Sequence, residues 1–218
     1  LDVAATLGIG DLMCYGAHPG EVLATLRENN IPSVMGNYDE AVAFNRETAS
    51  RKPSSPRNEP LKRAALKWTQ QAVNDKDRAY LRSLPWMSGF RFAGQRVHLL
   101  HAGLDHLDEW VAPDAPESLR KIARHFPNSI VALGHSHQQF TETLDDVLLV
   151  NPGAVGRSLD GDTRAAFAVV DVETRKVDFH RIAYPLEQTL QAIKQSGMPE
   201  EIARLIGHGA RRIEEIAP

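Results

Sequence analysis

The chain has 218 residues, of which 42% are hydrophobic and 24% charged, a composition typical of a globular protein with room for one substantial core. Its formal net charge of -3 gives no general attraction to nucleic acid or to an anionic membrane. The single cysteine, Cys14, excludes an internal disulfide framework and fits a reducing compartment. No stretch has the pattern of a membrane span or a secretory signal, so we expect a cytoplasmic protein without a membrane partner.

The first part of the chain predicts two strands separated by a helix. Residues 4–9 are mostly apolar and end shortly before Asp11, and residues 31–35 form a second apolar run that ends shortly before Asn37. Between them, Pro19 suits the first turn of a helix. Both predicted strands therefore deliver an oxygen-bearing side chain at their carboxyl ends.

Residues 40–88 have a different character from their surroundings. Residues 51–60 are polar and rich in proline, which predicts a mobile surface loop. Apolar side chains at helical spacing predict a helix over residues 61–72, and a shorter helix follows and stops at Pro85. We expect these helices to form an insertion within a single domain that spans residues 1–218.

The second half of the chain alternates strands with helices and ends in hairpins. The predicted elements are a hairpin over residues 90–100, a helix over 117–126, strands over 129–133 and 147–150, a hairpin with arms 165–170 and 176–183, and two C-terminal helices broken at 197–199. This order favours an α/β fold of the αβ-sandwich type, in which two β-sheets are flanked by helices.

Potential metal ligands follow four of the predicted strands. Asp11 and Asn37 follow the first two, His101 follows the arm of the first hairpin, and His135 and His137 follow the strand over 129–133. Sites in open α/β sheets form at the carboxyl ends of strands. In extended backbone, alternate side chains share a face, so we expect both histidines of the pair to point the same way. Taken alone, the pair is explained equally well by a helix cap and a surface residue, but the other strand ends favour a metal site.

The ordered set Gly-Asp, Gly-Asn-x-Asp, His and Gly-His-x-His resembles the calcineurin-like metallophosphoesterases. The likeness covers nearly the whole chain and includes Tyr15-Gly16 and residues 65–69, 80–85, 151–156 and 160–164. It implies that family's αβ-sandwich fold and a centre of two divalent metal ions, where a metal-bound hydroxide attacks phosphorus in line. By this resemblance Asp11 bridges the two metals. The residues that it assigns to one metal are Asn37, His101 and His135, and His137 joins Asp11 at the other.

Two features depart from the pattern of the family. The family opens with a strand that ends in Asp-x-His, and no such motif precedes Asp11, so the usual first strand is expected to be absent from this sequence. Tyr38 stands where many relatives have histidine, between Asn37 and Asp39, and the resemblance implies a catalytic role for all three. In the family that histidine stabilises the transition state or protonates the leaving oxygen, and the aspartate orients it.

Tyrosine at position 38 predicts a particular substrate preference. A phenol with an ordinary pKa of about 10 donates a hydrogen bond well but is a poorer proton donor than histidine. We therefore expect activity to favour diesters with good leaving groups over unactivated monoesters.

These patterns predict a metal-dependent phosphoesterase, more specifically a phosphodiesterase that acts on a phosphoester substrate. Mixed imidazole, carboxylate and amide ligands favour a borderline metal, Mn first with Fe, Ni or Zn as alternatives, over a pure Mg site. A non-catalytic metal-binding scaffold of the same fold is the main competing interpretation. A nuclease is a further alternative that stays open, although no extended basic groove is evident in the sequence.

Overall fold

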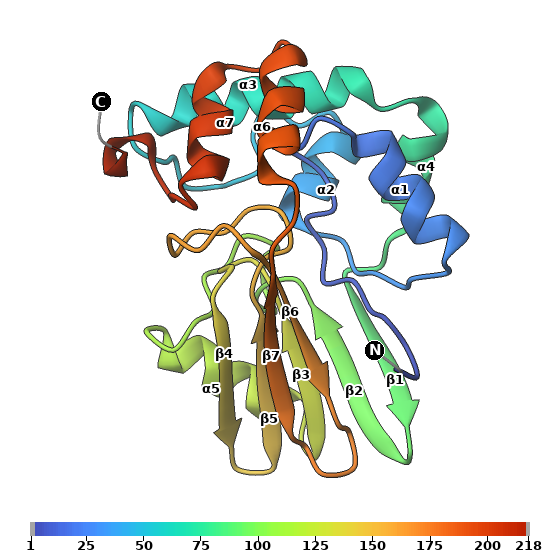
Figure 1. Cartoon of the computed structure of the whole chain (residues 1–218). Helices are drawn as coiled ribbons and strands as arrows, with labels where there is room; N and C mark the ends of the chain where they lie inside the picture. The colour runs from blue at the N-terminus through green and yellow to red at the C-terminus, as the bar shows by residue number, and fades with distance from the viewer. Residues whose placement is uncertain (1–2, 217–218) are drawn as a thin grey trace.

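Two β-sheets and seven α-helices make up the structure, a computed structural model that describes residues 3–216 (Figure 1). The larger sheet has five strands in the order β1-β2-β3-β5-β4, and β6 pairs with β7 in the smaller sheet. The strands are β1 (Met87–Phe92), β2 (Gln95–Leu100), β3 (Ser129–Leu133), β4 (Gln139–Leu144), β5 (Val147–Pro152), β6 (Ala165–Val170) and β7 (Val177–Ile182). The predicted α/β class with two sheets flanked by helices is therefore confirmed.

All helices except α5 gather beyond one end of the sheets, and α5 lies along the larger sheet (Figure 1). The helices are α1 (Pro19–Glu28), α2 (Asn37–Ala43), α3 (Asn58–Ala72), α4 (Asp75–Ser83), α5 (Pro116–His125), α6 (Leu186–Gln195) and α7 (Glu200–Gly207), and a 3-10 turn follows at Ile213–Glu215. Strands β2, β3 and β5 are parallel, so their carboxyl ends all face the layer of helices. Within residues 3–216 we find no helix with the length and apolar character needed to cross a membrane.

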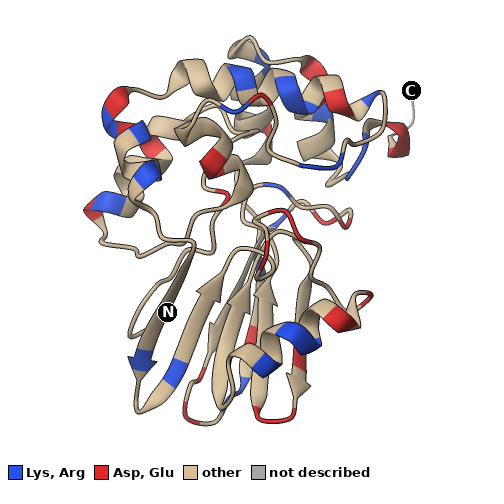
Figure 2. Cartoon of the chain, turned by 180° about the vertical axis from the view of Figure 1, so that it is seen from behind, with Lys and Arg blue, Asp and Glu red and all other residues tan. Residues whose placement is uncertain are grey.

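Local sequence signals explain where several helices begin and end. Helix α1 carries Pro19 in its first turn, where the missing N–H has no intrahelical acceptor to lose. Helix α4 is capped by Asn74, whose side chain accepts a hydrogen bond of 2.9 Å from the Asp77 N–H. It ends just before Pro85, as predicted. Charged residues of both signs lie mainly on these helices and on the loops, with few on the strands (Figure 2).

The larger sheet is buried on both faces. Helix α5 covers one face with the side chains of Leu119 and Ile122, which pack against Val131 and Leu149. The β6–β7 hairpin covers the other face. The apolar residues between the two sheets are Val97, Ile130, Leu148 and Val150 of the larger sheet, against Ala168, Val170 and Val177 of the hairpin. This double burial explains why β3 and β5 have almost continuous apolar runs.

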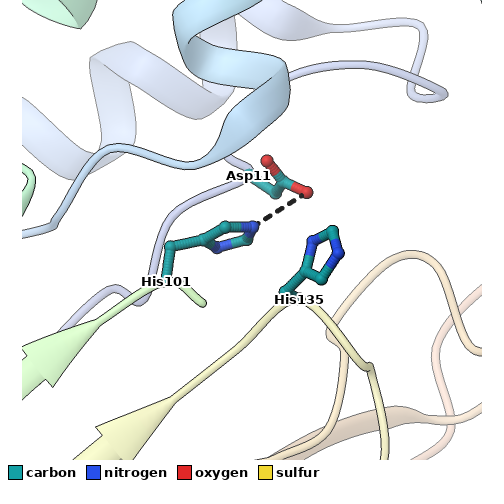
Figure 3. A group of neighbouring side chains, drawn as sticks. All are labelled: Asp11, His101 and His135. Carbon is teal, nitrogen blue, oxygen red and sulfur yellow. Dashed lines mark ion pairs between the residues drawn. The ribbon is translucent and has the colours of Figure 1, made fainter. Parts of the chain in front are cut away.

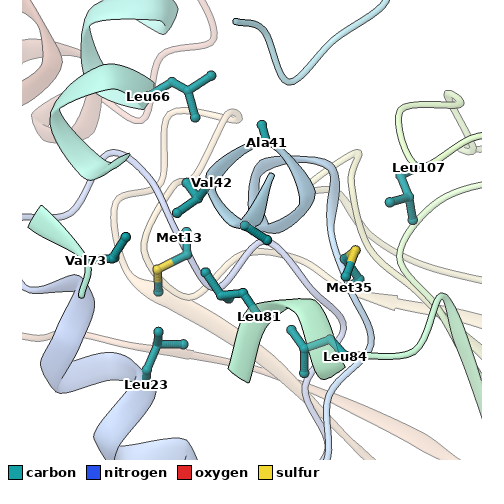
Figure 4. Close-up of a cluster of buried hydrophobic side chains, with 11 residues drawn as sticks. Met13, Leu23, Met35, Ala41, Val42, Leu66, Val73, Leu81, Leu84 and Leu107 are labelled. Carbon is teal, nitrogen blue, oxygen red and sulfur yellow. The ribbon is translucent and has the colours of Figure 1, made fainter. Parts of the chain in front are cut away.

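The layer of helices has its own apolar core at the carboxyl ends of the strands (Figure 4). Leu23 of α1, Val42 of α2 and Leu81 of α4 meet there and are fully buried. Helix α3 also packs against α6 and α7, and the indole N–H of Trp68 donates a 2.7 Å hydrogen bond to the Ser196 carbonyl. Helices α3 and α4 thus pack against other helices on several sides. The assignment of residues 40–88 as an insertion within a single domain stays a prediction.

The hairpin of β1 and β2 forms as predicted, but the strand β4 at the opposite edge of the sheet was missed. Ala93 and Gly94 connect β1 to β2 with φ angles of 46° and 82°, the left-handed geometry of a two-residue hairpin turn. Strand β4 pairs with β5 at the opposite edge of the sheet. Only Phe140 of β4 is buried, because edge strands keep one side in solvent, and the polar sequence of β4 therefore carries a weak strand signal.

The two strands predicted over residues 4–9 and 31–35 are wrong. The two segments run side by side but form only one isolated parallel bridge, between Gly8 and Ser33, with flanking backbone hydrogen bonds of 2.8 and 3.3 Å. One bridge stabilises a parallel pair of segments only weakly. Among residues 3–216, no strand forms a ladder of hydrogen bonds with either segment. Residues 3–6 are exposed as a result. Asp11 and Asn37 consequently reach their positions on loops.

Truncation in the helical core should destabilise the protein strongly. Leu81 is 0% exposed, so Leu81→Ala removes buried methyl groups and leaves a cavity among the helices around it. We expect a loss of about 2–5 kcal/mol in the free energy of unfolding, measured by urea titration. Val155→Ala is the control, because Val155 is 69% exposed and its truncation should change stability by less than about 0.5 kcal/mol. Equal effects of the two substitutions would contradict this packing.

Candidate metal centre

Four potential ligands from four separate segments meet where the larger sheet faces the helices. Asp11 lies on the first loop, Asn37 begins α2, His101 follows β2 directly, and His135 lies two residues beyond β3. One ligand atom each of Asp11, His101 and His135 lies within 4.8 Å of the others (Figure 3). The structure thus brings together residues that are separated by as many as 124 positions in the chain. Of the four, only His101 and His135 follow strands as predicted, whereas Asp11 and Asn37 follow loops.

The amide oxygen of Asn37 lies at the centre of this group. It is 3.0 Å from Nε2 of His101 and 3.0 Å from Nδ1 of His135. The Asn37 amide nitrogen donates a 2.8 Å hydrogen bond to the Ala49 carbonyl, which fixes the oxygen toward the histidines. Asn37 and His101 are 3% and 2% exposed, so this arrangement is shielded from solvent.

The hydrogen bonds of His101 determine which of its nitrogens can bind a cation. Its Nδ1 lies 2.8 Å from the Ile9 carbonyl, which can only accept, so Nδ1 carries a proton. Nε2 then faces the Asn37 oxygen and, at 3.4 Å, the carboxylate of Asp11. In neutral His101 these are three electron-pair donors that point at one another. A shared cation relieves this repulsion, and the set therefore fits a divalent metal ion.

The pKa values in the site reflect this need for positive charge. Burial alone would lower the pKa of His101, but the Asp11 carboxylate beside it raises the pKa above its usual value overall. For Asp11, burial raises the pKa, and the attraction of His101 outweighs burial and brings it to about 2. Burial and the neighbouring His101 lower the pKa of His135 to about 4. His135 is therefore neutral at pH 7, as a metal ligand must be.

The structure orients His137 differently from the sequence-based expectation. Strand β3 ends at Leu133, and His135 and His137 both have φ angles of 59°, so the extended backbone predicted for this pair is wrong. Gly134 begins a turn instead, in which its carbonyl accepts from the Ser136 N–H at 2.6 Å. Nδ1 of His137 donates to the Arg157 carbonyl, which leaves Nε2 unprotonated and suited to binding a metal. His137 lies outside the compact group of Asp11, His101 and His135.

Strained and closely packed backbone positions the ligands. Asp11 has a φ of 52°, so three of the five predicted metal ligands, with His135 and His137, adopt a left-handed conformation that non-glycine residues rarely adopt. Gly36 approaches the Asp11 loop so closely that an added Cβ would lie 2.1 Å from the Asp11 nitrogen. Such strain persists only where the surrounding contacts enforce it, and it is common at functional sites.

Asp39 connects the two loops that carry Asp11 and Asn37. Its carboxylate accepts hydrogen bonds from the backbone N–H groups of Gly36, at 2.8 Å, and Met13, at 3.1 Å. Burial, followed by the negative charge of Asp11, raises the pKa of Asp39 to about 7. The observed contacts of its carboxylate are with backbone, and none of the hydrogen bonds among residues 3–216 joins it to Tyr38.

Tyr38 and Tyr15 form a half-buried pair beside Asp11. Their hydroxyl oxygens are 2.8 Å apart, and the Tyr38 N–H donates a 2.9 Å hydrogen bond to the Asp11 carboxylate. Burial and the neighbouring Tyr15 raise the pKa of Tyr38 well above its ordinary value. Tyr15 was not predicted as a site residue from the sequence, although its nearness to Asp11 in the chain was a signal. Arg157, whose side chain lies over the Tyr15 ring, had no such signal.

Comparison with known proteins is consistent with this geometry. A family model described as a calcineurin-like phosphoesterase superfamily domain matches residues 2–175. The chain is 26% identical over 209 residues to the uncharacterized protein MJ0912 of Methanocaldococcus jannaschii, covering 88% of this chain and 81% of that protein.

Two solved structures share the fold over most of their length. A metallophosphoesterase from Sphaerobacter thermophilus is 27% identical with a TM-score of 0.72, and the match covers 96% of this chain and 89% of that one. A hypothetical protein, PH1004, from Pyrococcus horikoshii OT3 is 22% identical with a TM-score of 0.74, and the match covers 94% and 84% of the two chains.

Adding a methyl group at Gly36 should weaken metal binding. The new Cβ would lie 2.1 Å from the Asp11 nitrogen and 2.2 Å from its carboxylate oxygen, so Asp11 has to move. We expect Gly36→Ala to reduce the affinity for Mn²⁺ by about tenfold or more, measured by titration calorimetry. In Gly16→Ala the added Cβ meets nothing within 4 Å, so this variant should bind as the wild type does. Unchanged affinity in Gly36→Ala would show that the loop contact does not position Asp11.

Metal binding should release a proton near neutral pH. The raised pKa of His101 means that a fraction of the metal-free protein holds a proton on Nε2, and a metal ion must displace it. Affinity should therefore fall as pH is lowered through this pKa. The measurement is Mn²⁺ titration in two buffers of different ionisation enthalpy at the same pH, where the apparent enthalpies should differ. Identical enthalpies would contradict proton release. The control is His125→Ala, which removes an exposed histidine at the end of α5 and should behave as the wild type does.

Proposed function

Because the chain belongs to the calcineurin-like phosphoesterase superfamily, we propose that it hydrolyses a phosphodiester at a centre of two divalent metal ions. The observation that carries the proposal is the convergence of Nε2 of His101, the Asn37 amide oxygen and the Asp11 carboxylate in a buried site. Neutral protein atoms do not satisfy such a group, whereas a cation does. Mixed nitrogen and oxygen ligands support Mn, with Fe, Ni or Zn as alternatives.

In this proposal the ligands divide between two metal positions. Asn37, His101 and His135 would hold one ion together with Asp11, and His137 would hold the second, also with Asp11. The contacts of His137 support its role, since its Nδ1–H bond to the Arg157 carbonyl orients the ring and frees Nε2. Two bound divalent ions would neutralise phosphate charge and lower the pKa of bound water.

The tyrosine pair supports the proposed preference for diesters. With its raised pKa, Tyr38 stays protonated at neutral pH, so its hydroxyl can donate a hydrogen bond to a phosphoryl oxygen but transfers a proton poorly. Asp39 supports Tyr38 indirectly, because it holds the first turn of α2 through the Gly36 N–H. A diester with a good leaving group needs less protonation of the departing oxygen.

We also retain the prediction of a cytoplasmic location, which the single Cys14 supports because it fits a reducing compartment.

The direct test is Mn-dependent hydrolysis of an activated aryl phosphodiester by the protein. We expect turnover that disappears with chelator and falls by at least about 100-fold in His135→Ala, since that variant loses a ligand of the metal site. Metal content should be read on the same samples by mass spectrometry, with two ions per chain expected in the wild type. His125→Ala removes an exposed histidine on α5 and should leave both turnover and metal content unchanged.

Two results would overturn parts of the proposal. Turnover of an alkyl phosphomonoester equal to or faster than that of the diester would remove the assigned preference. No turnover of either ester, with at most one metal ion per chain, would favour a non-catalytic metal-binding scaffold of the same fold.

A further inference from the structure

Arg157 has a guanidinium group that no carboxylate among residues 3–216 neutralises within ion-pair distance. It lies in the loop between β5 and β6. Burial is the main influence on its pKa, which lies below the usual value for arginine. Its near neighbour Arg164, in the same loop, is paired with Asp162 instead. A half-buried cation without a counter-ion is unfavourable unless an anion joins it.

The contacts of Arg157 leave one edge of its guanidinium group free. Nη1 donates hydrogen bonds of 2.7 Å to the Ala210 carbonyl and 3.2 Å to the Ser158 carbonyl. Cζ of the group lies over the ring of Tyr15, 4.9 Å from the ring centroid. Among residues 3–216, neither Nε nor Nη2 has a hydrogen-bond acceptor. These two atoms form a fork that matches two oxygens of a phosphate, and the contacts of Nη1 hold it in place.

Two chains of contacts join Arg157 to the candidate metal centre. Its backbone carbonyl accepts a hydrogen bond from Nδ1 of His137. Tyr15, on which its side chain stacks, contacts the Tyr38 hydroxyl, and the Tyr38 N–H donates to Asp11. The Arg157 backbone is thus in direct contact with His137, and its guanidinium group is connected to Asp11 through Tyr15 and Tyr38.

We propose that Arg157 binds the phosphoryl group of the substrate with its Nε and Nη2 atoms, as a catalytic residue. The inference rests on the proposed phosphoesterase function. In it, Arg157 is a third positive group that binds the phosphate, in addition to the two proposed metal ions. It predicts that the site binds substrates whose phosphoryl group has two non-bridging oxygens available. The Nε and Nη2 atoms can each donate a hydrogen bond to one of these oxygens. The ring of Tyr15, which lies against the guanidinium group, positions these two atoms.

The competing role for Arg157 is a purely structural one. The bonds from Nη1 tie the β5–β6 loop to Ala210, after α7, and this anchoring contributes to stability. Those carbonyl partners are neutral, however, and they use only one of the three guanidinium nitrogens. A structural clamp therefore leaves the charge and the free edge unexplained, whereas phosphate binding accounts for both.

The test is titration of inorganic phosphate into the full chain, both Mn-loaded and metal-free, followed by calorimetry. Arg157→Gln should weaken phosphate binding by about tenfold or more, because it removes a charge-assisted hydrogen-bonding group. Arg157→Lys should have an intermediate effect, since it keeps the charge but loses the fork. Arg164→Gln, from the same loop, should bind phosphate as the wild type does, because its guanidinium already pairs with Asp162. Melting temperatures identify any variant that fails to fold.

The outcomes separate this proposal from the proposed function. If Arg157→Gln melts at a lower temperature but binds phosphate as tightly as the wild type, Arg157 is only a structural clamp and the proposal is overturned. Absence of phosphate binding by the wild type in both metal states overturns it as well. Loss of phosphate binding in Arg157→Gln upholds the assignment even if no ester is turned over, a result that would count against the hydrolytic function alone.

Discussion

The region between the carboxyl ends of the parallel strands and the layer of helices is organised around electron-pair donors that point at one another. The Asn37 oxygen, the Asp11 carboxylate and Nε2 of His101 share a small buried volume, with the imidazole oriented by the Ile9 carbonyl. Buried groups of this kind repel unless a positive charge lies between them. In the metal-free protein a proton on His101 supplies part of this positive charge. The pKa of His101 is raised for this reason, because the Asp11 carboxylate stabilises the protonated ring. The same arrangement makes the site selective for a cation, and the fold around it maintains that arrangement.

The fold maintains this geometry mainly through backbone contacts. Gly36 approaches Asp11 within a distance that admits no side chain, and the Asp39 carboxylate holds both loops by accepting two backbone N–H bonds. Neither loop is anchored by a regular strand, because residues 4–9 and 31–35 share only one bridge. The apolar core around Leu81 supports the loops from the helical side. Specific hydrogen bonds here replace the ladder that usually positions ligands at strand ends.

The sequence predicted the fold class and most elements because their signals are local. Apolar runs at β3 and β5, helical spacing in α3 and the turn at Gly94 all depend on nearby residues. The errors arose where structure depends on distant partners. Residues 4–9 have the composition of a strand, but strand formation requires neighbours that a one-dimensional pattern does not reveal. The edge strand β4 lacked an apolar signal for a similar reason.

The candidate site was predictable to a similar extent and for similar reasons. The ligand types were readable from the sequence, as was the position of His101 and His135 after strands, and these two converge with Asp11 and Asn37 in the structure. The conformation of His137 was not predictable, since its left-handed backbone depends on the turn at Gly134 and on the Arg157 carbonyl. Arg157 itself is separated from Tyr15 by 142 positions in the chain, and only the tertiary structure reveals their contact.

The balance between charge stabilisation and proton donation limits the chemistry that this site performs well. Tyr38 holds its proton too tightly to act as an effective acid, since burial raises its pKa far above neutrality. Asp39 has a pKa of about 7, but both of its oxygens accept backbone hydrogen bonds, so its proton has no direct path to a substrate. In the proposed site the positive charge would come from a cation held by Asp11, Asn37, His101 and His135 and from the guanidinium group of Arg157, which has no ion-pair partner among residues 3–216. Under the proposed function, such a site would stabilise a phosphoryl group strongly and help the leaving group weakly, which is the combination that suits an ester whose alcohol departs without protonation.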